Sequence, residues 1–298
     1  MRKRFNVTGS CNPDRHYMVD TETRFNAIKQ LIDAGDYFTI NRARQYGKTT
    51  MLNDIWRRLS DEFMVVPLSF EGWGDESFTS PLAFVSTFKR QMARQLASLP
   101  QKEHLVRIWD ESDVSSLEDL SVVITDFCRA CKVPVVVTID EVDKSSDNQL
   151  FLNFLGMLRN KYLERDREGM DSTFHSVIFA GVYDVKNLKL RLRPNEERKY
   201  NSPWNIAADF NVDMTFHPEE IAQMLSDYEN DAHTGMDIKG ISEEIYKYTT
   251  GYPFLVSYIC KIIDEQYGQV WTSEIIVYDK FIVMQSSHTH ADAKLLIA

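Results

Sequence analysis

Short apolar runs alternate with longer amphipathic segments through the first two thirds of the chain. Four runs rich in β-branched and aromatic residues predict strands at residues 37–41, 64–70, 133–140 and 176–181. The third run is apolar almost throughout, as expected for a central strand covered on both faces. A shorter run at residues 212–216 predicts a fifth strand.

Helical periodicity fills the intervals between these strands. Apolar residues spaced three and four apart predict helices at residues 24–33, 48–59, 81–99, 117–131 and 148–165. Strands that alternate with helices of this length are typical of βαβ units, which build parallel sheets with helices on both faces. The pattern therefore predicts an α/β fold.

The pattern changes after about residue 215, where only helical segments follow. These segments cover residues 218–230, 241–250 and 253–268. We therefore expect two domains, an α/β core at residues 1–215 and a helical lid domain at residues 216–298.

A Gly-Lys-Thr-Thr sequence lies between the first predicted strand and the helix after it. Backbone amides in such a loop form a concave site for a phosphate at the positive end of the helix. Lys48 would reach the β- and γ-phosphates, and the Thr49 hydroxyl would bind magnesium. Arg42 stands where the full phosphate-loop pattern has its first glycine, so an ordinary strand-to-helix loop is the alternative. The expected nucleotide-binding residues of the loop are Arg44, Gln45, Tyr46, Gly47, Lys48, Thr49 and Thr50.

The most apolar predicted strand ends in two carboxylates, Asp140 and Glu141, about 90 residues after Lys48. Asp140 would hold the magnesium ion, and Glu141 would act as the general base that polarises the attacking water. The alternative is a carboxylate pair that merely ends a strand. The two motifs together favour a nucleotide-hydrolysing site, with the loop as Walker A and the strand end as Walker B.

Six segments resemble the predicted AAA-like ATPases of bacteria, which are related to signal-transduction and archaeal ATPases. These segments cover nearly the whole chain in the expected order, at residues 16–20 (HYMVD), 37–50 (YFTINRARQYGKTT), 137–144 (VTIDEVDK), 180–189 (AGVYDVKNLK), 201–207 (NSPWNIA) and 249–257 (TTGYPFLVS). An arginine at the start of the phosphate loop is usual in that family. The resemblance identifies the chain as a P-loop NTPase.

The resemblance implies a parallel five-stranded sheet in which the phosphate-loop strand and the acidic strand lie side by side. It implies that Tyr17 and Asp20, with the residues between them, lie against the adenine. Pro253, in a glycine–x–proline motif, would start a helix where the lid touches the nucleotide. The resemblance also implies a polar γ-phosphate sensor, for which Tyr183 and Asp184 are candidates.

An arginine that stabilises transition-state charge is also implied, in cis or from a partner. Arg191 and Arg193 are candidates, although a solvated basic loop at residues 186–203 explains them equally well. Salt-dependent binding of nucleic acid by this loop would indicate a nucleic-acid-associated ATPase. The formal net charge of -10 gives that alternative no general support.

The remaining composition indicates a cytoplasmic protein. No apolar run approaches the roughly 20 residues of a membrane helix, so we expect no membrane segment. Four cysteines without framework spacing fit a reducing compartment, and Cys128 and Cys131 read as buried helix cysteines rather than as a metal or redox site.

The sequence thus predicts an ATP-binding, magnesium-dependent hydrolase that acts as a switch or motor domain. Its cofactors would be ATP or ADP and Mg²⁺, and turnover would be slow without a protein partner that the sequence does not identify. A nucleotide-binding scaffold with negligible turnover is the main alternative.

Overall fold

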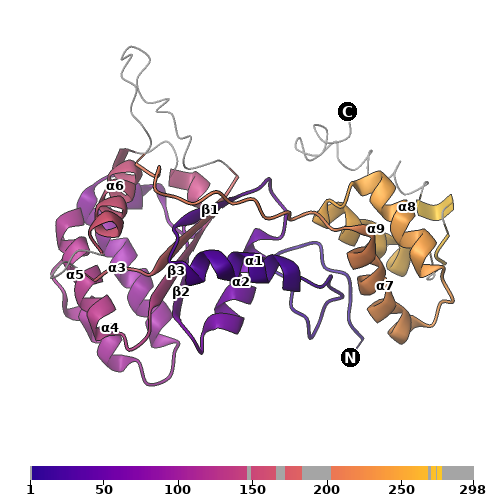
Figure 1. Cartoon of the computed structure of the whole chain (residues 1–298), viewed down its shortest axis with the longest axis horizontal. Coiled ribbons are helices and arrows are strands. Elements are labelled where there is room, and N and C mark those ends of the chain that lie inside the picture. The colour runs from indigo at the N-terminus through magenta and orange to yellow at the C-terminus, as the bar shows by residue number, and fades with distance from the viewer. Residues whose placement is uncertain are drawn as a thin grey trace, which may run out of the picture. The chain divides into compact units, whose positions relative to one another are not determined.

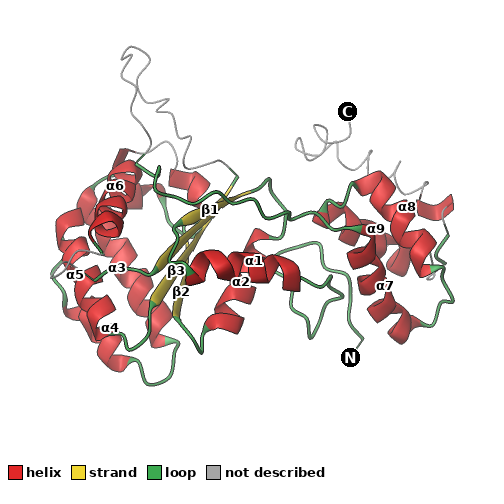
Figure 2. Ribbon diagram, in the orientation of Figure 1, coloured by secondary structure: helices red, strands yellow, loops and turns green. Residues whose placement is uncertain are grey.

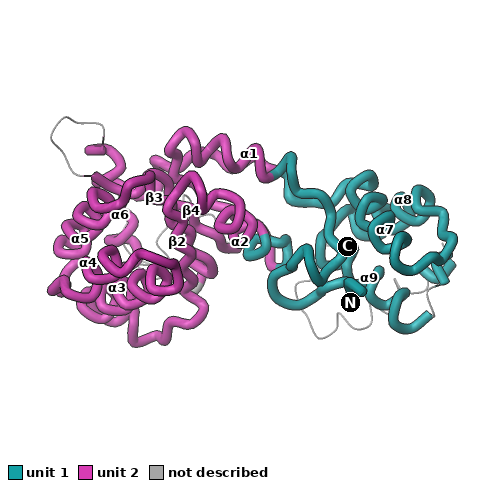
Figure 3. Tube along the Cα trace, turned by 90° about the horizontal axis from the view of Figure 1, so that it is seen from below, with its two compact units in different colours: residues 1–24, 45–50, 213–298 teal, residues 25–44, 51–212 magenta. Residues whose placement is uncertain are grey.

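The computed structural model of the chain describes residues 2–145, 149–165, 172–182, 203–267, 270–272 and 274–276. The chain divides into two compact units, which Figure 3 shows in different colours. Unit 1 comprises Met1–Arg24, Gln45–Thr50 and Asp213–Ala298, and unit 2 comprises Phe25–Arg44 and Met51–Val212. The predicted domains at residues 1–215 and 216–298 stay a prediction.

A parallel sheet forms the centre of unit 2. Its strands are β1 (Phe38–Asn41), β2 (Met64–Ser69), β3 (Val135–Asp140) and β4 (Ser176–Gly181), in the order β1-β4-β3-β2. The register pairs Asn41 with Gly181 and Ser69 with Asp140, so the carboxyl ends of all four strands lie at one edge. The parallel α/β architecture is confirmed, and each of these strands begins and ends within two residues of its predicted range.

Two details of the predicted sheet are wrong. Strand β4 lies between β1 and β3, so the phosphate-loop strand and the acidic strand are not side by side. The sheet has four strands rather than five in the described part of the chain, because no strand forms at residues 212–216. On the open side of β1, Ala208 instead makes a single parallel bridge to Phe38.

Side chains form hydrogen bonds with backbone groups of residues 212–216 that would otherwise pair with a neighbouring strand. The Asp213 carboxylate accepts the Thr215 amide at 2.9 Å, and Arg24 donates to the carbonyl oxygens of Asp213 and Thr215. Local bonds of this kind compete with strand pairing. Residues 212–216 have a strand-like composition but form a connection without regular secondary structure.

Helices pack on both faces of the sheet, as Figure 2 shows. Helices α1 (Glu22–Asp33) and α2 (Lys48–Leu59) lie on one face. The other face carries α3 (Pro81–Ala97), α4 (Glu103–Glu111), α5 (Leu117–Ala130) and α6 (Gln149–Glu164). Two 3₁₀ turns, η1 (Asp75–Phe78) and η2 (Val142–Ser145), lie in the connections. Helix α4 was not predicted from the sequence.

The larger core lies between the sheet and α3–α6, and it is rich in aromatic rings. Phe84, Phe88 and Phe154 are fully buried with ring centroids 5.1–6.4 Å apart. Short polar residues fix where the helices begin: Ser80 accepts the Ala83 amide at 3.2 Å before α3. Such caps satisfy the amides that the first helical turn leaves unpaired.

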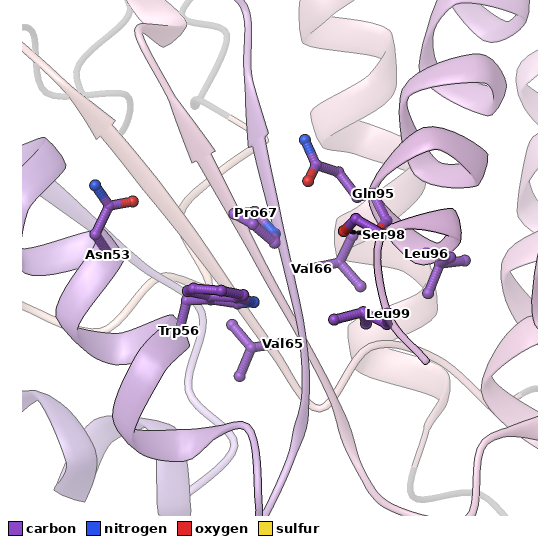
Figure 4. A pocket seen from close by; sticks show the side chains of 9 residues that line it. All are labelled: Asn53, Trp56, Val65, Val66, Pro67, Gln95, Leu96, Ser98 and Leu99. Atoms are coloured by element: carbon purple, nitrogen blue, oxygen red, sulfur yellow. Dashed lines mark hydrogen bonds between the residues drawn. The ribbon is translucent and has the colours of Figure 1, made fainter. Parts of the chain in front are cut away.

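Strand β2 is an edge strand, and a cavity of about 260 Å³ lies against it. Figure 4 shows Asn53 and Trp56 of α2 on one side of the strand and the end of α3 on the other. Pro67 lies in the middle of β2, where its missing amide suits an edge position. From β2 the cavity is lined by Val65, Val66 and Pro67, and it is not lined by the carboxyl ends of the strands.

Three helices, α7 (Pro218–Ala232), α8 (Ile238–Thr249) and α9 (Pro253–Gln266), form the helical part of unit 1. Phe5 and Tyr17 from the N-terminal segment complete the core of these helices. Each helix was predicted within a few residues, but the N-terminal contribution was not. Among the described residues, no helix is both long enough and apolar enough to cross a bilayer.

Candidate functional site

Arg42 is a structural residue at the start of the phosphate loop. Its amide donates to the Gly181 carbonyl at 3.2 Å, and its guanidinium donates to the Val212 carbonyl at 2.8 Å and stacks 5.2 Å from the Phe210 ring. These bonds tie the end of β1 to β4 and to the connection after residue 208. An arginine therefore occupies the position of the first pattern glycine for a reason of packing.

The phosphate loop has a backbone that alternates in handedness. Gln45 and Gly47 have φ angles of 62° and 76°, whereas Tyr46 between them has an ordinary negative φ. Alternating φ signs turn successive amide N–H groups toward one concave side, which is the geometry of an anion-binding nest. A Cβ added at Gly47 would meet no atom of the chain within 4 Å, so its left-handed φ, not a contact within the chain, requires glycine.

Helix α2 begins at Lys48, directly after this nest. Its first amides have no partners within the helix, and its dipole is positive at this end. Lys48 is buried and Thr49 is exposed. The Thr50 hydroxyl accepts the Cys11 amide at 3.0 Å, so this side chain anchors the N-terminal segment. The residues fit a phosphate at the helix start, as the sequence predicts.

The acidic residues lie at the carboxyl end of a strand whose six side chains are all buried. Asp140 is 6% exposed, and its Oδ1 accepts the Glu141 amide at 2.9 Å. Glu141 has a left-handed φ of 56°, a conformation that costs a non-glycine residue roughly 1–2 kcal/mol. Strain of this kind is concentrated at functional sites.

Asp143 was not predicted as a site residue, yet it holds the ends of β3 and β4 together. Its Oδ2 accepts the Val182 amide at 2.7 Å. A Cβ at Gly181 would lie 2.8 Å from Asp143 Oδ1, so glycine is needed for this close approach. A carboxylate three residues after Asp140 was the available signal.

Tyr17 packs inside unit 1. Its side chain is 3% exposed, its ring centroid lies 5.0 Å from that of Phe5, and its hydroxyl donates to Asp231 at 2.8 Å. Burial raises the pKa of Tyr17 to about 12. The Asp20 carboxylate accepts the Glu22 amide at 2.8 Å and so supports the start of α1. Base contacts by Tyr17 and Asp20 stay a prediction.

Pro253 is the first residue of α9 and is buried. The structure gathers Tyr17, Asp20, Gln45, Tyr46, Gly47, Lys48, Thr49, Thr50 and Pro253 in unit 1. Arg44, Asp140 and Glu141 belong to unit 2. The candidates Tyr183, Asp184, Arg191 and Arg193 lie outside the described residues.

The metal ligands proposed from the sequence are a hydroxyl and a carboxylate. Oxygen atoms of this kind are what Mg²⁺ prefers, and Mg²⁺ in nucleotide sites takes only one or two protein ligands besides water and phosphate oxygens. Thr49 and Asp140 therefore fit the ion in chemical type. In the described ranges, no group of three or more His, Cys, Asp or Glu side chains could hold a metal by itself.

The two cysteines at the end of α5 are structural. Burial raises the pKa of the Cys128 thiol well above its ordinary value and that of Cys131 to about 11. Thiols in this state are poor nucleophiles and poor metal ligands at neutral pH. Both side chains pack against the larger core, but they are partly exposed rather than buried, and Cys131 follows the last residue of α5.

Comparison with solved structures finds distant similarity to Aeropyrum pernix proteins. The ORC1 protein in complex with DNA has 10% identity and a TM-score of 0.47, with 91% of this chain and 66% of that chain covered. The ORC2 protein in its ADP form has 13% identity and a TM-score of 0.48, with coverage of 92% and 70%. The ORC2 protein in its ADPNP–ADP complexes has 12% identity and a TM-score of 0.49, with 91% of this chain and 68% of that chain covered.

No curated protein matches the sequence. A family model described as an AAA-like domain matches residues 8–277. That match includes the phosphate loop, the acidic strand end and the helices α7–α9. The chain belongs to the family of AAA-like domains, which are P-loop ATPases.

Proposed function

We propose that this chain binds ATP with Mg²⁺ and hydrolyses it slowly, as a nucleotide-controlled switch. The phosphate loop carries the proposal: a backbone nest at Gln45 and Gly47 opens directly onto the first turn of α2. Nests at helix N-termini bind phosphate through backbone amides and the helix dipole. The membership of the chain in a family of P-loop ATPases supports the same assignment.

Binding would depend on a small set of residues around that nest. The amides of Arg44, Gln45, Tyr46 and Gly47 would face the β-phosphate, and the Lys48 ammonium would neutralise the charge of the β- and γ-phosphates. Thr49 and Asp140 would hold Mg²⁺, which when bound neutralises phosphate charge and fixes the position of the γ-phosphate.

Hydrolysis would use Glu141 as the base. The carboxylate would accept a hydrogen bond from the attacking water and take its proton as the water oxygen bonds to the γ-phosphorus and the bond from that phosphorus to the departing ADP oxygen breaks. The left-handed backbone at Glu141 points this side chain differently from a residue that continued the strand. Positioning and electrostatic stabilisation together supply almost all of the rate enhancement in phosphoryl transfer.

The helical part of unit 1 would act as the lid that transmits the nucleotide state to a protein partner. Pro253 and the segment from Tyr17 to Asp20 would contact the base side of the nucleotide.

All four cysteines are unpaired, which supports a reducing compartment such as the cytoplasm.

The test is steady-state ATP hydrolysis with Mg²⁺ by the native chain, Lys48→Ala and Glu141→Gln. Lys132→Ala serves as a control, since Lys132 is exposed and lies before β3. We expect Glu141→Gln to lower kcat by about 10²–10⁴-fold while ATP still binds. Lys48→Ala should weaken ATP binding by roughly 10–100-fold, the value of a hydrogen bond to a charged group.

Turnover in the native chain that survives Glu141→Gln unchanged would contradict the assignment of the base. Tight ATP binding without turnover would instead indicate the nucleotide-binding scaffold.

A further inference from the structure

An aromatic pair joins the phosphate loop to the start of helix α9. The ring centroids of Tyr46 and Tyr252 lie 4.9 Å apart at an interplanar angle of 38°. The Tyr252 hydroxyl lies 3.5 Å from the Gln45 side-chain oxygen, at the outer limit of a hydrogen bond. Both loop residues therefore lie against one side chain of unit 1, which Figure 3 shows in teal.

The backbone of Tyr252 is fixed on both sides. Its amide donates to the Thr249 carbonyl at 2.9 Å, and its carbonyl accepts the Val256 amide at 3.0 Å. Gly251 before it has a φ of 74°, and a Cβ there would lie 2.1 Å from the Phe216 carbonyl oxygen. Pro253 after it fixes the first turn of α9. Tyr252 is thus presented from a rigid turn.

The loop residues that Tyr252 contacts have a strained backbone, which needs contacts with other residues to stabilise it. Gln45 adopts a left-handed φ of 62° although it is not a glycine, and its side chain is exposed. A strained backbone persists only where surrounding contacts determine it. Tyr252 is only 9% exposed and contributes an aromatic contact next to this residue, through Tyr46.

We propose that Tyr252 is a positioning residue for the phosphate loop, which holds the nest at Gln45–Gly47 in its phosphate-binding form and couples that form to helix α9. The proposal rests on the proposed nucleotide-binding function. Tyr252 itself need not touch the nucleotide. Its removal takes away no phosphate-binding group, since the amide donors and Lys48 are still present. It does free the loop to leave the conformation with alternating φ signs.

The test compares Tyr252→Ala and Tyr252→Phe with Tyr258→Ala. Tyr258 is a matched control because it belongs to the same aromatic cluster but stacks on Phe254, 5.5 Å away, rather than on Tyr46. The first readout is amide hydrogen exchange without nucleotide at residues 52–55, the first amides that α2 pairs within itself. Tyr252→Ala should raise exchange there by about threefold or more, because a freed loop lets the first turn of α2 open, and Tyr258→Ala should leave it unchanged.

The second readout is the Kd for Mg-ATP in a calorimeter. Tyr252→Ala should raise the Kd by about two- to tenfold, as expected for the loss of an aromatic pair, and Tyr252→Phe should keep it within about twofold. In the double variant Tyr46→Ala/Tyr252→Ala, the loss should be no greater than in the worse single variant, because both remove the same contact.

Unchanged exchange and an unchanged Kd in a folded Tyr252→Ala variant would overturn the positioning role. Equal effects of Tyr252→Ala and Tyr258→Ala would also overturn it, since they would reflect the general stability of the helices. If neither the native chain nor any of the variants binds ATP, the proposed function fails. The exchange readout still decides the role of Tyr252 in the loop.

Discussion

Replacing Gly251 with alanine should destabilise unit 1 far more than the same change at another left-handed glycine. Gly251 and Gly235 have the same φ of 74°. Alanine at either position must adopt a left-handed backbone, at a cost of roughly 1–2 kcal/mol, partly offset by about 0.4–1 kcal/mol from the stiffer unfolded chain. Gly235→Ala should therefore cost about 1 kcal/mol.

The surroundings of Gly251 add a second cost. The new Cβ would lie 2.1 Å from the Phe216 oxygen and 2.9 Å from its nitrogen, both backbone atoms, whereas at Gly235 it would meet nothing within 4 Å. The turn must then open, and the bond from the Phe216 amide to the Gly251 carbonyl, now 2.7 Å, is weakened or lost. Because Gly251 is buried, leaving its carbonyl without that partner costs about 1–3 kcal/mol.

Urea denaturation followed by circular dichroism measures both variants against the native chain. We expect a loss of about 3 kcal/mol for Gly251→Ala, which corresponds to a thermal midpoint lower by roughly 6–12 °C. Gly235→Ala should lower the midpoint by less than about 4 °C. Equal losses in the two variants would refute the argument, because they would show that the contact with Phe216 has no energetic weight.

Three further predictions follow from single contacts. Burial, with Arg4 and Arg15 nearby, lowers the pKa of His16 below 6.5, so the folded state binds fewer protons than the unfolded state and the free energy of unfolding should fall as pH drops below about 6.5. His16→Gln should flatten that dependence in urea titrations, and a variant at the exposed His104 should retain it. Glu141→Asn should abolish ATP turnover yet raise the free energy of unfolding by up to about 1 kcal/mol, because asparagine tolerates the left-handed backbone. Glu141→Gln should give no such gain, and equal stability of the two variants would contradict this. Trp204→Ala should cost about 3–5 kcal/mol in urea denaturation, since the ring is fully buried and its Nε1 donates to the Thr39 hydroxyl at 3.1 Å, and a loss below about 1 kcal/mol would be inconsistent with that burial.

The sequence predicted the parts of the fold that depend on local pattern. Strand β4 and helix α2 were predicted with their observed bounds because apolar periodicity and flanking residues define both ends. The phosphate loop was predicted from Gly47, Lys48 and Thr49, and the structure adds the reason that Arg42 replaces a glycine.

Longer-range relations could not be predicted. The order of strands is set by which faces pack together, and no local pattern encodes the place of β4 between β1 and β3. The segment at 212–216 has strand-like residues, but Arg24, nearly 190 residues away in sequence, binds its carbonyl oxygens. The burial of Tyr17 among helices at the other end of the chain was invisible for the same reason.

Direct titration of Mg-ATP into the native chain and into Lys48→Ala, by isothermal calorimetry, tests the central claim most directly. The phosphate nest at Gln45 and Gly47 predicts saturable binding at one site per chain, weakened by roughly 10–100-fold in Lys48→Ala. An absence of heat in a native chain with intact circular dichroism, or equal affinities for the two proteins, would contradict the assignment of this loop as a nucleotide site.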